Sequence, residues 1–481
     1  MLYRSTRGSS PAVDSAGAVL SGIAPDGGLY LPEALPAFDW QGCLQKDTIS
    51  MAASLLTALL PGIPDMDTLT RRAYLGKFQT DDLTPTVTVG DFTVLELFRG
   101  PTSAFKDVAL CMLPQLLTAA KEVKGIREDI LILTATSGDT GKAALEDFRD
   151  VPGVKICVFY PDGGVSQVQR AQMVTQEGNN VTVCAVRGNF DDAQTGVKNI
   201  FAACQGKALP YRLSSANSIN IGRLAPQLTY YFAAYRDLVA RGQIHMGDRV
   251  NFSVPTGNFG DILAGYLAKQ LGLPVGALIC ASNANNVLTD FIHTGIYDRR
   301  RPLLKTQSPS MDILVSSNLE RLLALLSGDA ELVSGLMAKL SADGFYQVPG
   351  ALLEKIQASF FAGCSDDRRG QEVIGRVWRE QGYLLDPHTA AGWACAEDYR
   401  KKTGDTAPMV VLSTASPYKF PAAVLTAIGQ SLSGSEFDQM RQLEDVTGVP
   451  IPGNLATLAG KPQRHTAVVE KSEMLPFVLG L

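Results

Sequence analysis

The chain has few histidines, no closely paired cysteines and no long apolar run, and each shortage excludes a class of protein. Only 4 histidines occur among 481 residues, at positions 245, 293, 388 and 465, and none are spaced i, i+4. The 8 cysteines form no CxxC or CxxxC pair. Metal sites built on histidine or cysteine need such spacings, so we predict no metal centre.

Membrane, secreted and nucleic-acid-binding classes are disfavoured in the same way. No stretch approaches the roughly 18 apolar residues of a membrane span, and the first residues lack the apolar core of a secretory signal. The net charge of −5 would repel a phosphate backbone, and the two basic clusters, 299–301 and 400–402, are short. Cysteines within apolar runs suit a reducing cytosol. We predict a cytoplasmic protein, monomer or homodimer, with a small-molecule substrate and no nucleic-acid or membrane partner.

What the sequence does contain is a regular alternation of strands and helices. Buried strands are expected at 130–134, 154–160 and 180–186, with helices at 106–121, 140–148, 165–176 and 191–203 between and around them. A long helix is expected at 221–240. A second series follows, with strands at 249–254, 275–281 and 409–413 and helices at 261–271 and 421–428; residues 318–326 and 350–362 are the clearest helices of the stretch between.

This alternation predicts an α/β fold with parallel sheets covered by helices on both faces. We expect two doubly wound lobes with a cleft between them. The N-terminal accessory domain would span 1–95 and end in a hairpin at 84–98 that turns near Gly90. The smaller lobe would span 96–240. The larger would span 241–481, with a mainly helical insert at about 285–400 and a weakly patterned tail after 432.

Three strand-to-helix turns are rich in glycine and hydroxyl residues, at 134–141, 255–261 and 413–417. Free backbone N–H groups at such turns bind anions, although any strand–helix unit needs a turn. The first is not a P-loop, because that motif requires glycine at position 136 and serine or threonine at 143, where this chain has Thr136 and Ala143. A GxGxxG fingerprint is also missing, which argues against a dinucleotide-dependent dehydrogenase.

Lys106 follows a Gly100-Pro101 turn and stands next to Phe105, where its amine can be partly desolvated. Desolvation lowers the pKa of a lysine and makes it a nucleophile toward carbonyl groups; alone, the residue reads as a surface lysine opening a helix. A reactive lysine combined with anion-binding loops and a hydroxyl loop is the set of parts that a pyridoxal 5'-phosphate enzyme needs.

At these motifs, and nearly end to end, the chain resembles the threonine synthase family, in its longer form. That family has the pyridoxal phosphate fold type II, like the tryptophan synthase β subunit. The motifs that carry the resemblance are Ser5–Gly8, Ala24–Tyr30, Gly100–Thr102 with Ala104–Asp107, Ala135–Gly141, Asn217–Asn220 with Arg223, Thr256–Asp261, Ser308–Asp312, Asp386–Ala390, and Ser413–Ala415 with Lys419–Phe420.

The resemblance implies a role for each matched residue. Lys106 would carry pyridoxal phosphate as a Schiff base, and Asp139 would lie near the ring hydroxyl. The cofactor phosphate would meet Thr256, Gly257, Asn258, Phe259 and Gly260. Thr414 would bind the ring nitrogen, with Ser413 as the alternative. The substrate carboxylate would meet Ser137, Gly138 and Thr140, and Asn220 and Arg223 are candidates for the substrate phosphate.

The implied reaction converts O-phospho-L-homoserine and water to L-threonine and phosphate, by γ-elimination and β-addition of water. Two alternatives stay open: a phospho-lyase that ends at 2-oxobutyrate, and a non-catalytic relative that only binds the cofactor. One loop departs from many relatives, which have His-Pro-Ala-Lys where this chain has Ser416-Pro417-Tyr418-Lys419. We therefore expect this loop to differ in its substrate contacts. Asp386 and Pro387 are also explained as an ordinary helix start.

Overall fold

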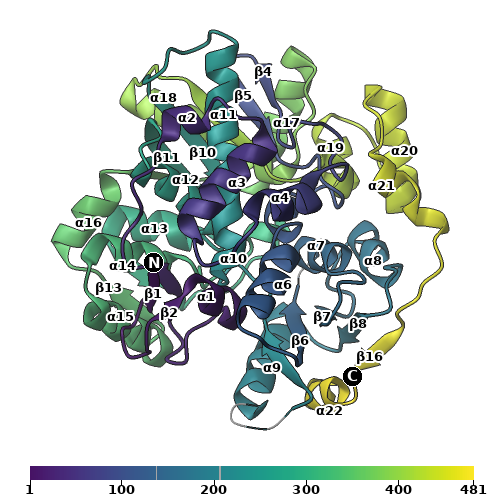
Figure 1. Cartoon of the computed structure of the whole chain (residues 1–481). Helices are drawn as coiled ribbons and strands as arrows, with labels where there is room; N and C mark the ends of the chain where they lie inside the picture. The colour runs from purple at the N-terminus through teal and green to yellow at the C-terminus, as the bar shows by residue number, and fades with distance from the viewer. Residues whose placement is uncertain (137, 205–206, 208) are drawn as a thin grey trace.

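The protein is an α/β structure built around two parallel sheets (Figure 1). The computed structural model describes residues 1–136, 138–204, 207 and 209–481, and for Asp191 the backbone alone. The α/β class with parallel sheets is the one that the sequence alternation predicts. Among the described residues no helix is long and apolar enough to cross a membrane.

The larger sheet has six strands in the order β14-β11-β10-β15-β5-β4. All neighbours are parallel except β4 and β5, which form an antiparallel hairpin. The strands are β4 (Thr86–Val89), β5 (Phe92–Glu96), β10 (Val250–Pro255), β11 (Val275–Ser282), β14 (Phe360–Cys364) and β15 (Met409–Ser413). Every residue of β5, β10 and β15 is buried, as expected for parallel strands covered on both faces.

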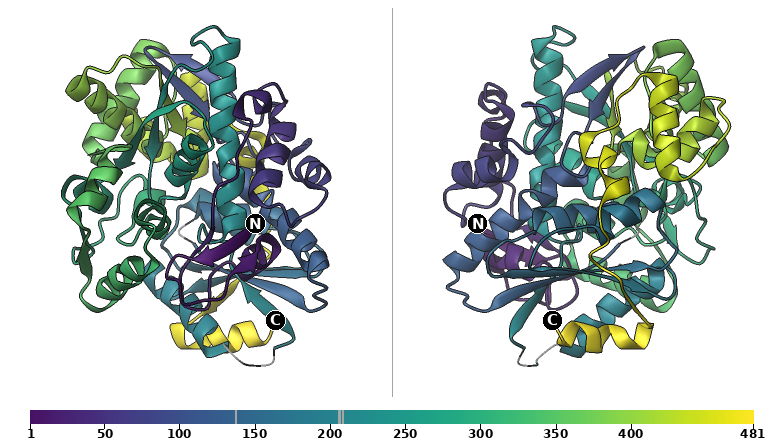
Figure 2. Two further views of the ribbon diagram at one scale, coloured as in Figure 1. Left: turned by 60° about the vertical axis from the view of Figure 1, so that its left-hand side comes forward. Right: turned by 90° about the vertical axis from the view of Figure 1, so that its right-hand side faces the viewer.

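The smaller sheet has five parallel strands in the order β16-β8-β7-β6-β9. They are β6 (Asp129–Ala135), β7 (Val154–Pro161), β8 (Val181–Val186), β9 (Tyr211–Ser214) and β16 (Ala467–Val469). The last of these comes from the tail, which runs from the larger lobe across to the smaller one (Figure 2).

Helices cover both sheets and join them. The large-lobe helix α18 packs on β10, β11, β14 and β15, and the small-lobe helix α9 packs on β6 and β7. Helix α5, which follows β5 of the larger sheet, contacts α7, which follows β6 of the smaller sheet. The helices are α5 (Lys106–Leu110), α6 (Leu113–Val123), α7 (Asp139–Asp147), α8 (Gln167–Val174), α9 (Phe190–Cys204), α10 (Ile221–Leu224), α11 (Leu228–Ala240), α12 (Gly260–Gln270), α13 (Val287–Thr294), α14 (Leu319–Ser327), α15 (Ala330–Ala342), α16 (Gly350–Gln357), α17 (Asp367–Gln381), α18 (Pro387–Thr403), α19 (Pro421–Ala427), α20 (Glu436–Thr447), α21 (Gly453–Ala456) and α22 (Met474–Leu479).

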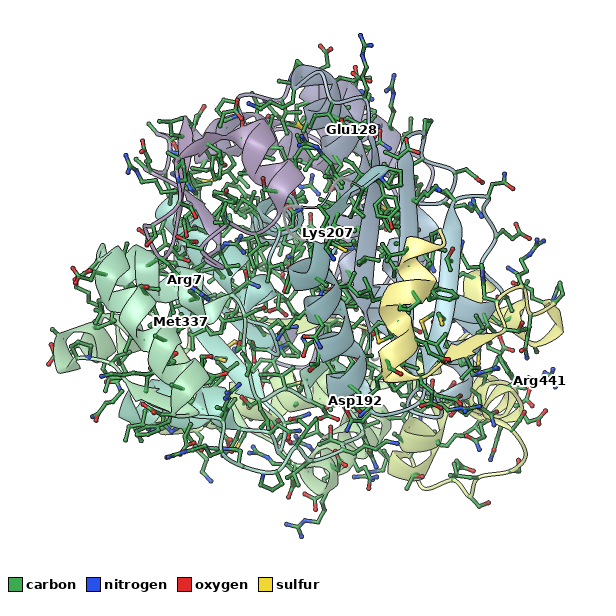
Figure 3. All side chains as sticks on the ribbon, turned by 90° about the horizontal axis from the view of Figure 1, so that it is seen from below. Arg7, Glu128, Asp192, Lys207, Met337 and Arg441 are labelled. Carbon is green, nitrogen blue, oxygen red and sulfur yellow. The ribbon has the colours of Figure 1, made fainter. Side chains whose placement is uncertain are left out.

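The N-terminal region adds a small antiparallel sheet and four helices to the front of the molecule (Figure 1). Its elements are β1 (Leu2–Ser5), β2 (Val13–Asp14), α1 (Ser15–Ser21), β3 (Tyr30–Pro32), α2 (Trp40–Cys43), α3 (Thr48–Leu59) and α4 (Met66–Tyr74). The Arg7 guanidinium binds Glu320 of α14 through two hydrogen bonds of 2.9 Å. Figure 3 labels Arg7 beside the green helices, to which this contact joins the N-terminal region. The proposed domain boundaries stay a prediction.

Three expected helices are interrupted. The helix predicted at 106–121 is two helices, α5 and α6, that meet at Cys111 and Met112. The helix predicted at 221–240 is divided into α10, a 3-10 turn at Ala225–Gln227 and α11, because Pro226 has no N–H to continue the helix. The helix predicted at 350–362 ends at Gln357, and its last residues enter strand β14.

Candidate active site

The site is built where three neighbouring parallel strands of the larger sheet end. Strands β10, β15 and β5 lie side by side, and ligands in such folds bind at the carboxyl ends of strands. The loop after β5 leads to Lys106, and the loop after β15 holds it in place. Phe105 N–H donates to the Thr414 carbonyl at 2.8 Å, and Ser416 N–H donates to the Ser103 carbonyl at 3.1 Å.

Asp107 stiffens the turn in front of Lys106. Its buried carboxylate accepts hydrogen bonds from the Thr102 hydroxyl and from the Thr102 N–H, the latter at 2.9 Å. Burial raises the pKa of this carboxyl to about 6. Gly100 is required beside it, because a Cβ at that position would lie 2.5 Å from Asp107 Cβ.

Lys106 is a buried amine with a lowered pKa. It begins α5 and is 8% exposed. Its Nζ lies 3.3 Å from Ser310 Oγ and 3.8 Å from Asp139 Oδ2, and 5.1 Å from the centre of the Phe105 ring. Burial lowers the pKa of Lys106 to about 8, although the charge of Asp139 acts in the opposite direction. The amine is therefore available as a nucleophile or base near neutral pH.

Asp139 approaches Lys106 from the smaller sheet, whereas Lys106 follows a strand of the larger one. It is in the first turn of α7, directly after the loop that follows β6 of the smaller sheet. Its carboxylate accepts hydrogen bonds from Gln169 Nε2 at 2.9 Å and from Ser310 Oγ at 3.3 Å. Lys419 Nζ lies 2.5 Å from its Oδ1. The two lysines and these hydrogen bonds hold the pKa of Asp139 well below its usual range despite burial, so the carboxylate is ionised.

The turn between β10 and α12 forms a cradle of free donors. Within the described part of the chain, no hydrogen bond uses the backbone N–H groups of Gly257, Asn258, Phe259 or Gly260. Phe259 has a left-handed backbone (φ 61°) and starts α12. A Cβ on Gly257 would lie 2.7 Å from the Ser310 carbonyl oxygen. Free N–H groups at a helix start are a site for an anion, so these residues fit a phosphate group.

Other predicted residues of the larger lobe line the same strand ends. The Thr256 hydroxyl donates to the Val254 carbonyl at 2.7 Å, and its N–H donates to the Ala281 carbonyl at 2.8 Å, so both donors of this residue are engaged. Thr414 is the first residue after β15, and no hydrogen bond among the described residues uses its hydroxyl. The Ser413 hydroxyl instead accepts from Thr389 at 3.0 Å. Of these two residues, Thr414 has the free group for a ring nitrogen.

The loop of the smaller lobe is shaped by Thr136. Its hydroxyl accepts from the Gly138 N–H at 3.0 Å and from the Gly141 N–H at 2.8 Å. Gly138 has φ 141° and no room for a side chain, because a Cβ would lie 2.4 Å from Gln169 Nε2. Thr140 is half-buried in the first turn of α7. Ser137, predicted to bind the substrate carboxylate, lies outside the described residues.

Arg223 and Asn220, the predicted phosphate ligands, differ in what their side chains already bind. Arg223 is buried and donates one hydrogen bond, to the Ala216 carbonyl at 2.6 Å; in the described part of the chain it pairs with no carboxylate. Burial lowers its pKa to about 10. The Asn220 amide is engaged at both ends, donating to the Val19 carbonyl and accepting from the Gly222 N–H. Arg223 therefore has free donors, whereas Asn220 holds the start of α10.

Three further residues belong to the site: Lys419, Gln169 and Ser310. The sequence predicted no role for Gln169 or Ser310 and left the role of Lys419 open. Each comes from a segment far from Lys106 in sequence, so only the fold brings them together. A chain of two buried contacts fixes the backbone of Ser310. Its N–H donates to His388 Nε2 at 3.2 Å, and His388 Nδ1 contacts Asp386 Oδ1 at 2.8 Å. Asp386 also caps α18, as the sequence predicted.

The fold and the site together define a class of enzyme. The protein has two parallel sheets covered by helices, and at neighbouring strand ends of one sheet it has a buried lysine and a glycine-rich anion cradle. This is the architecture of pyridoxal phosphate enzymes of fold type II.

The comparisons with known proteins identify the family. Profiles described as "Threonine synthase N terminus" and "Threonine synthase, C-terminal" match residues 2–53 and 389–475. Threonine synthase of Pseudomonas aeruginosa is 43% identical over 440 residues, covering 90% of this chain and 91% of its own. The structure of pyridoxal phosphate-bound threonine synthase from Brucella melitensis is 40% identical, with a TM-score of 0.87, covering 100% and 98% of the two chains. For yeast threonine synthase the structural match has 33% identity and a TM-score of 0.88 over 100% and 97%. The chain belongs to the threonine synthase family.

Proposed function

We propose that this protein is a threonine synthase, which converts O-phospho-L-homoserine and water to L-threonine and phosphate with pyridoxal 5'-phosphate as cofactor. The observation that carries the proposal is the buried Lys106 amine, set between Asp139 and the free N–H cradle in a chain of this family. The wider expectations, a cytoplasmic monomer or homodimer with no nucleic-acid partner, belong to this proposal too.

Lys106 and residues at the strand ends of the larger sheet would hold the cofactor. Lys106 would bind its aldehyde carbon, and the N–H groups of Gly257, Asn258, Phe259 and Gly260 would bind its phosphate, next to Thr256. The free hydroxyl of Thr414 would meet the ring nitrogen. A hydroxyl partner leaves that nitrogen less charged than a carboxylate would. When bound, pyridoxal phosphate supplies an electron sink beside the α-carbon of the substrate.

The smaller lobe would supply the substrate contacts. The turn at Gly138 and Thr140 lies at a helix start, where the positive end of the helix favours a carboxylate. The resemblance assigns Ser137 to the same carboxylate. Arg223 has a buried guanidinium with unused donors, which suits the substrate phosphate. Asn220 would help only indirectly, by fixing the start of the helix that carries Arg223.

Lys106 would carry the protons of the reaction. Because its pKa is lowered to about 8, an appreciable fraction of the amine is neutral near pH 7.5 and can accept a proton from the α-carbon. Once it has returned that proton to the bound substrate, it would be neutral again and could accept a second proton from the β-carbon. Release of phosphate from the γ-carbon then opens the way for water at the β-carbon. Ser310 and Asp139 would keep the amine on one face of the site.

The test is substitution of Lys106 by alanine, with product analysis. We expect Lys106→Ala to lose at least about 10³-fold in turnover, because both proton transfers use this amine. The control is Lys142→Ala, which removes a half-buried lysine of α7 that pairs with Glu146 at 2.8 Å. The unsubstituted enzyme should release threonine and phosphate in equal amounts. Release of 2-oxobutyrate and ammonia would instead show a phospho-lyase, and full turnover by Lys106→Ala would reject the proposal.

A further inference from the structure

Asp139 lies between two buried lysines, and the two contacts are unequal. Lys419 Nζ is 2.5 Å from Asp139 Oδ1, whereas Lys106 Nζ is 3.8 Å from Oδ2. The Lys419 side chain is fully buried and that of Asp139 is 2% exposed. Because a single carboxylate can neutralise only one ammonium group fully, the nearer lysine takes most of its charge.

Lys419 is fixed in this position by the protein. It ends the 3-10 turn η3 (Pro417–Lys419), which follows β15 and is capped by Ser416. Its Nζ also donates to the Thr102 carbonyl at 3.2 Å, in the turn in front of Lys106. The Gln169 side chain of α8 donates a hydrogen bond to the same Asp139 oxygen at 2.9 Å. The Lys419–Asp139 ion pair therefore joins the larger lobe to the smaller one at the site itself.

The charged groups that face Lys106 come from four elements. They are Asp139 on α7, Lys419 on η3, Arg223 on α10 and Asp261 on α12. The two cations favour the neutral amine, and the two carboxylates favour the ammonium form. Asp261 carries only part of its negative charge near neutral pH, because burial raises its pKa to about 7.

We propose that Lys419 is a positioning residue that takes up the charge of Asp139, so that Lys106 keeps only a weak ionic contact and reacts as a neutral amine. Without Lys419, Lys106 would be the one lysine left beside Asp139 among the described residues, and Asp139 would hold it in the ammonium form. The inference rests on the role of Lys106 in the proposed function. It concerns the titration of Lys106, however, and that can be measured without cofactor or substrate.

The experiment compares Lys419→Gln, which removes the charge and keeps a polar group, with Lys419→Arg, which keeps the charge. The full-length chain, freed of cofactor, is treated with formaldehyde and cyanoborohydride over a series of pH values. Methylation of Lys106 is then read by peptide mass spectrometry. In Lys419→Gln we expect the midpoint of Lys106 reactivity to rise by about one pH unit, because an opposite charge at this range shifts a pKa by that order. In Lys419→Arg the midpoint should stay near that of the unsubstituted chain.

Lys142→Gln is the matched control, since it removes a half-buried ammonium group near the site that is paired with Glu146 rather than Asp139. It should leave the Lys106 midpoint unchanged. Circular dichroism verifies that each variant is folded. An unchanged midpoint in a folded Lys419→Gln variant would overturn the proposal. So would an equal rise in Lys142→Gln. A changed KM for substrate with no change of midpoint would assign Lys419 to the substrate phosphate instead. None of these outcomes bears on whether the enzyme makes threonine.

Discussion

At the scale of single residues, the protein buries several carboxyl groups besides Asp139. Among the described residues, Asp147 has a buried carboxylate oxygen that lacks a hydrogen-bond partner. Asp147 is the last residue of α7, and the oxygen without a partner is its Oδ2. The nearest cation, Lys77 Nζ, is 3.8 Å from its Oδ1. Burial raises the pKa of Asp147 to about 7, only partly offset by Lys77.

This raised pKa predicts a pH-dependent effect of Asp147→Asn. The folded protein keeps a proton on Asp147 up to about pH 7, whereas the unfolded chain releases it near pH 4. The residue therefore stabilises the fold most at low pH, and this contribution is lost as the pH rises through 7. Relative to the unsubstituted chain, we expect Asp147→Asn to gain about 1–3 kcal/mol in free energy of unfolding between pH 5 and pH 8.

Urea unfolding of both chains at pH 5, 6, 7 and 8 measures this difference. Glu128→Gln is the control, because it removes an exposed carboxylate from the same lobe, labelled at the periphery in Figure 3. A difference that stays constant over the four pH values would contradict the raised pKa.

The residues of the site were predictable from sequence only where a local motif marks them. Lys106, Asp139 and the turn at 256–260 lie within short, specific patterns, and the fold brings all of them to one place. Gln169 carries no such pattern, and Ser310 lies in the matched Ser308–Asp312 motif without a role assigned to it, because the contribution of both depends on a helix and a turn that pack against Asp139 from distant parts of the chain. Lys419 lies in a matched motif and also in the loop that departs from its relatives, and its role was left open.

At the scale of elements, the turn between β10 and α12 tests the phosphate cradle most directly. In Gly257→Ala a Cβ would lie 2.7 Å from the Ser310 carbonyl oxygen, and a backbone atom cannot move aside easily. In Gly260→Ala the nearest atom would be Asn318 Nδ2 at 3.4 Å, an ordinary contact. We expect Gly257→Ala to weaken pyridoxal phosphate binding at least tenfold, equal to about 1.4 kcal/mol.

Equilibrium dialysis followed by absorbance of the retained cofactor gives the two dissociation constants. Gly260→Ala should bind within a few-fold of the unsubstituted chain. Equal binding by both variants would show that the turn has room to adjust and that Gly257 is not part of the cradle.

Elements with strong local signals were predicted well, and those set by long-range contacts were not. The hairpin of β4 and β5 turns at Gly90, which has φ 54°, because glycine beside aspartate favours this conformation. Strand β14 was taken for the end of a helix. Its strand character comes from pairing with β11, which no local pattern reveals. The break at Pro226 follows from proline chemistry, but a proline in the first turn or two of a helix is tolerated, so the sequence predicted one continuous helix.

At the scale of the whole molecule, the weakly patterned tail is a structural part of the smaller lobe. Strand β16 pairs with β8, and α22 packs on α9. The Lys155 ammonium donates to the Leu481 carbonyl at 2.6 Å, and the Tyr211 hydroxyl donates to the Val478 carbonyl at 3.0 Å. Met474 and Val478 are buried against the sheet.

We therefore expect Met474→Ala to destabilise the protein although it lies far from the site in sequence. The cavity left by a buried methionine should lower the free energy of unfolding by about 2–4 kcal/mol. Urea unfolding measures this loss. Leu479→Ala is the control, because this neighbour in α22 is 52% exposed. Equal and small effects of the two substitutions would show that α22 is not packed against α9.

The pairing of β16 with β8 also matters while the protein is being made. Lys155 and the Leu481 carbonyl that it binds are 326 residues apart, so a ribosome must add most of the larger lobe before the smaller sheet receives its last strand. Until then the edge of β8 presents open backbone groups to other nascent chains, the situation in which strands aggregate. During this stretch of translation, the open edge of β8 is therefore a part of the nascent chain that chaperones would have to cover.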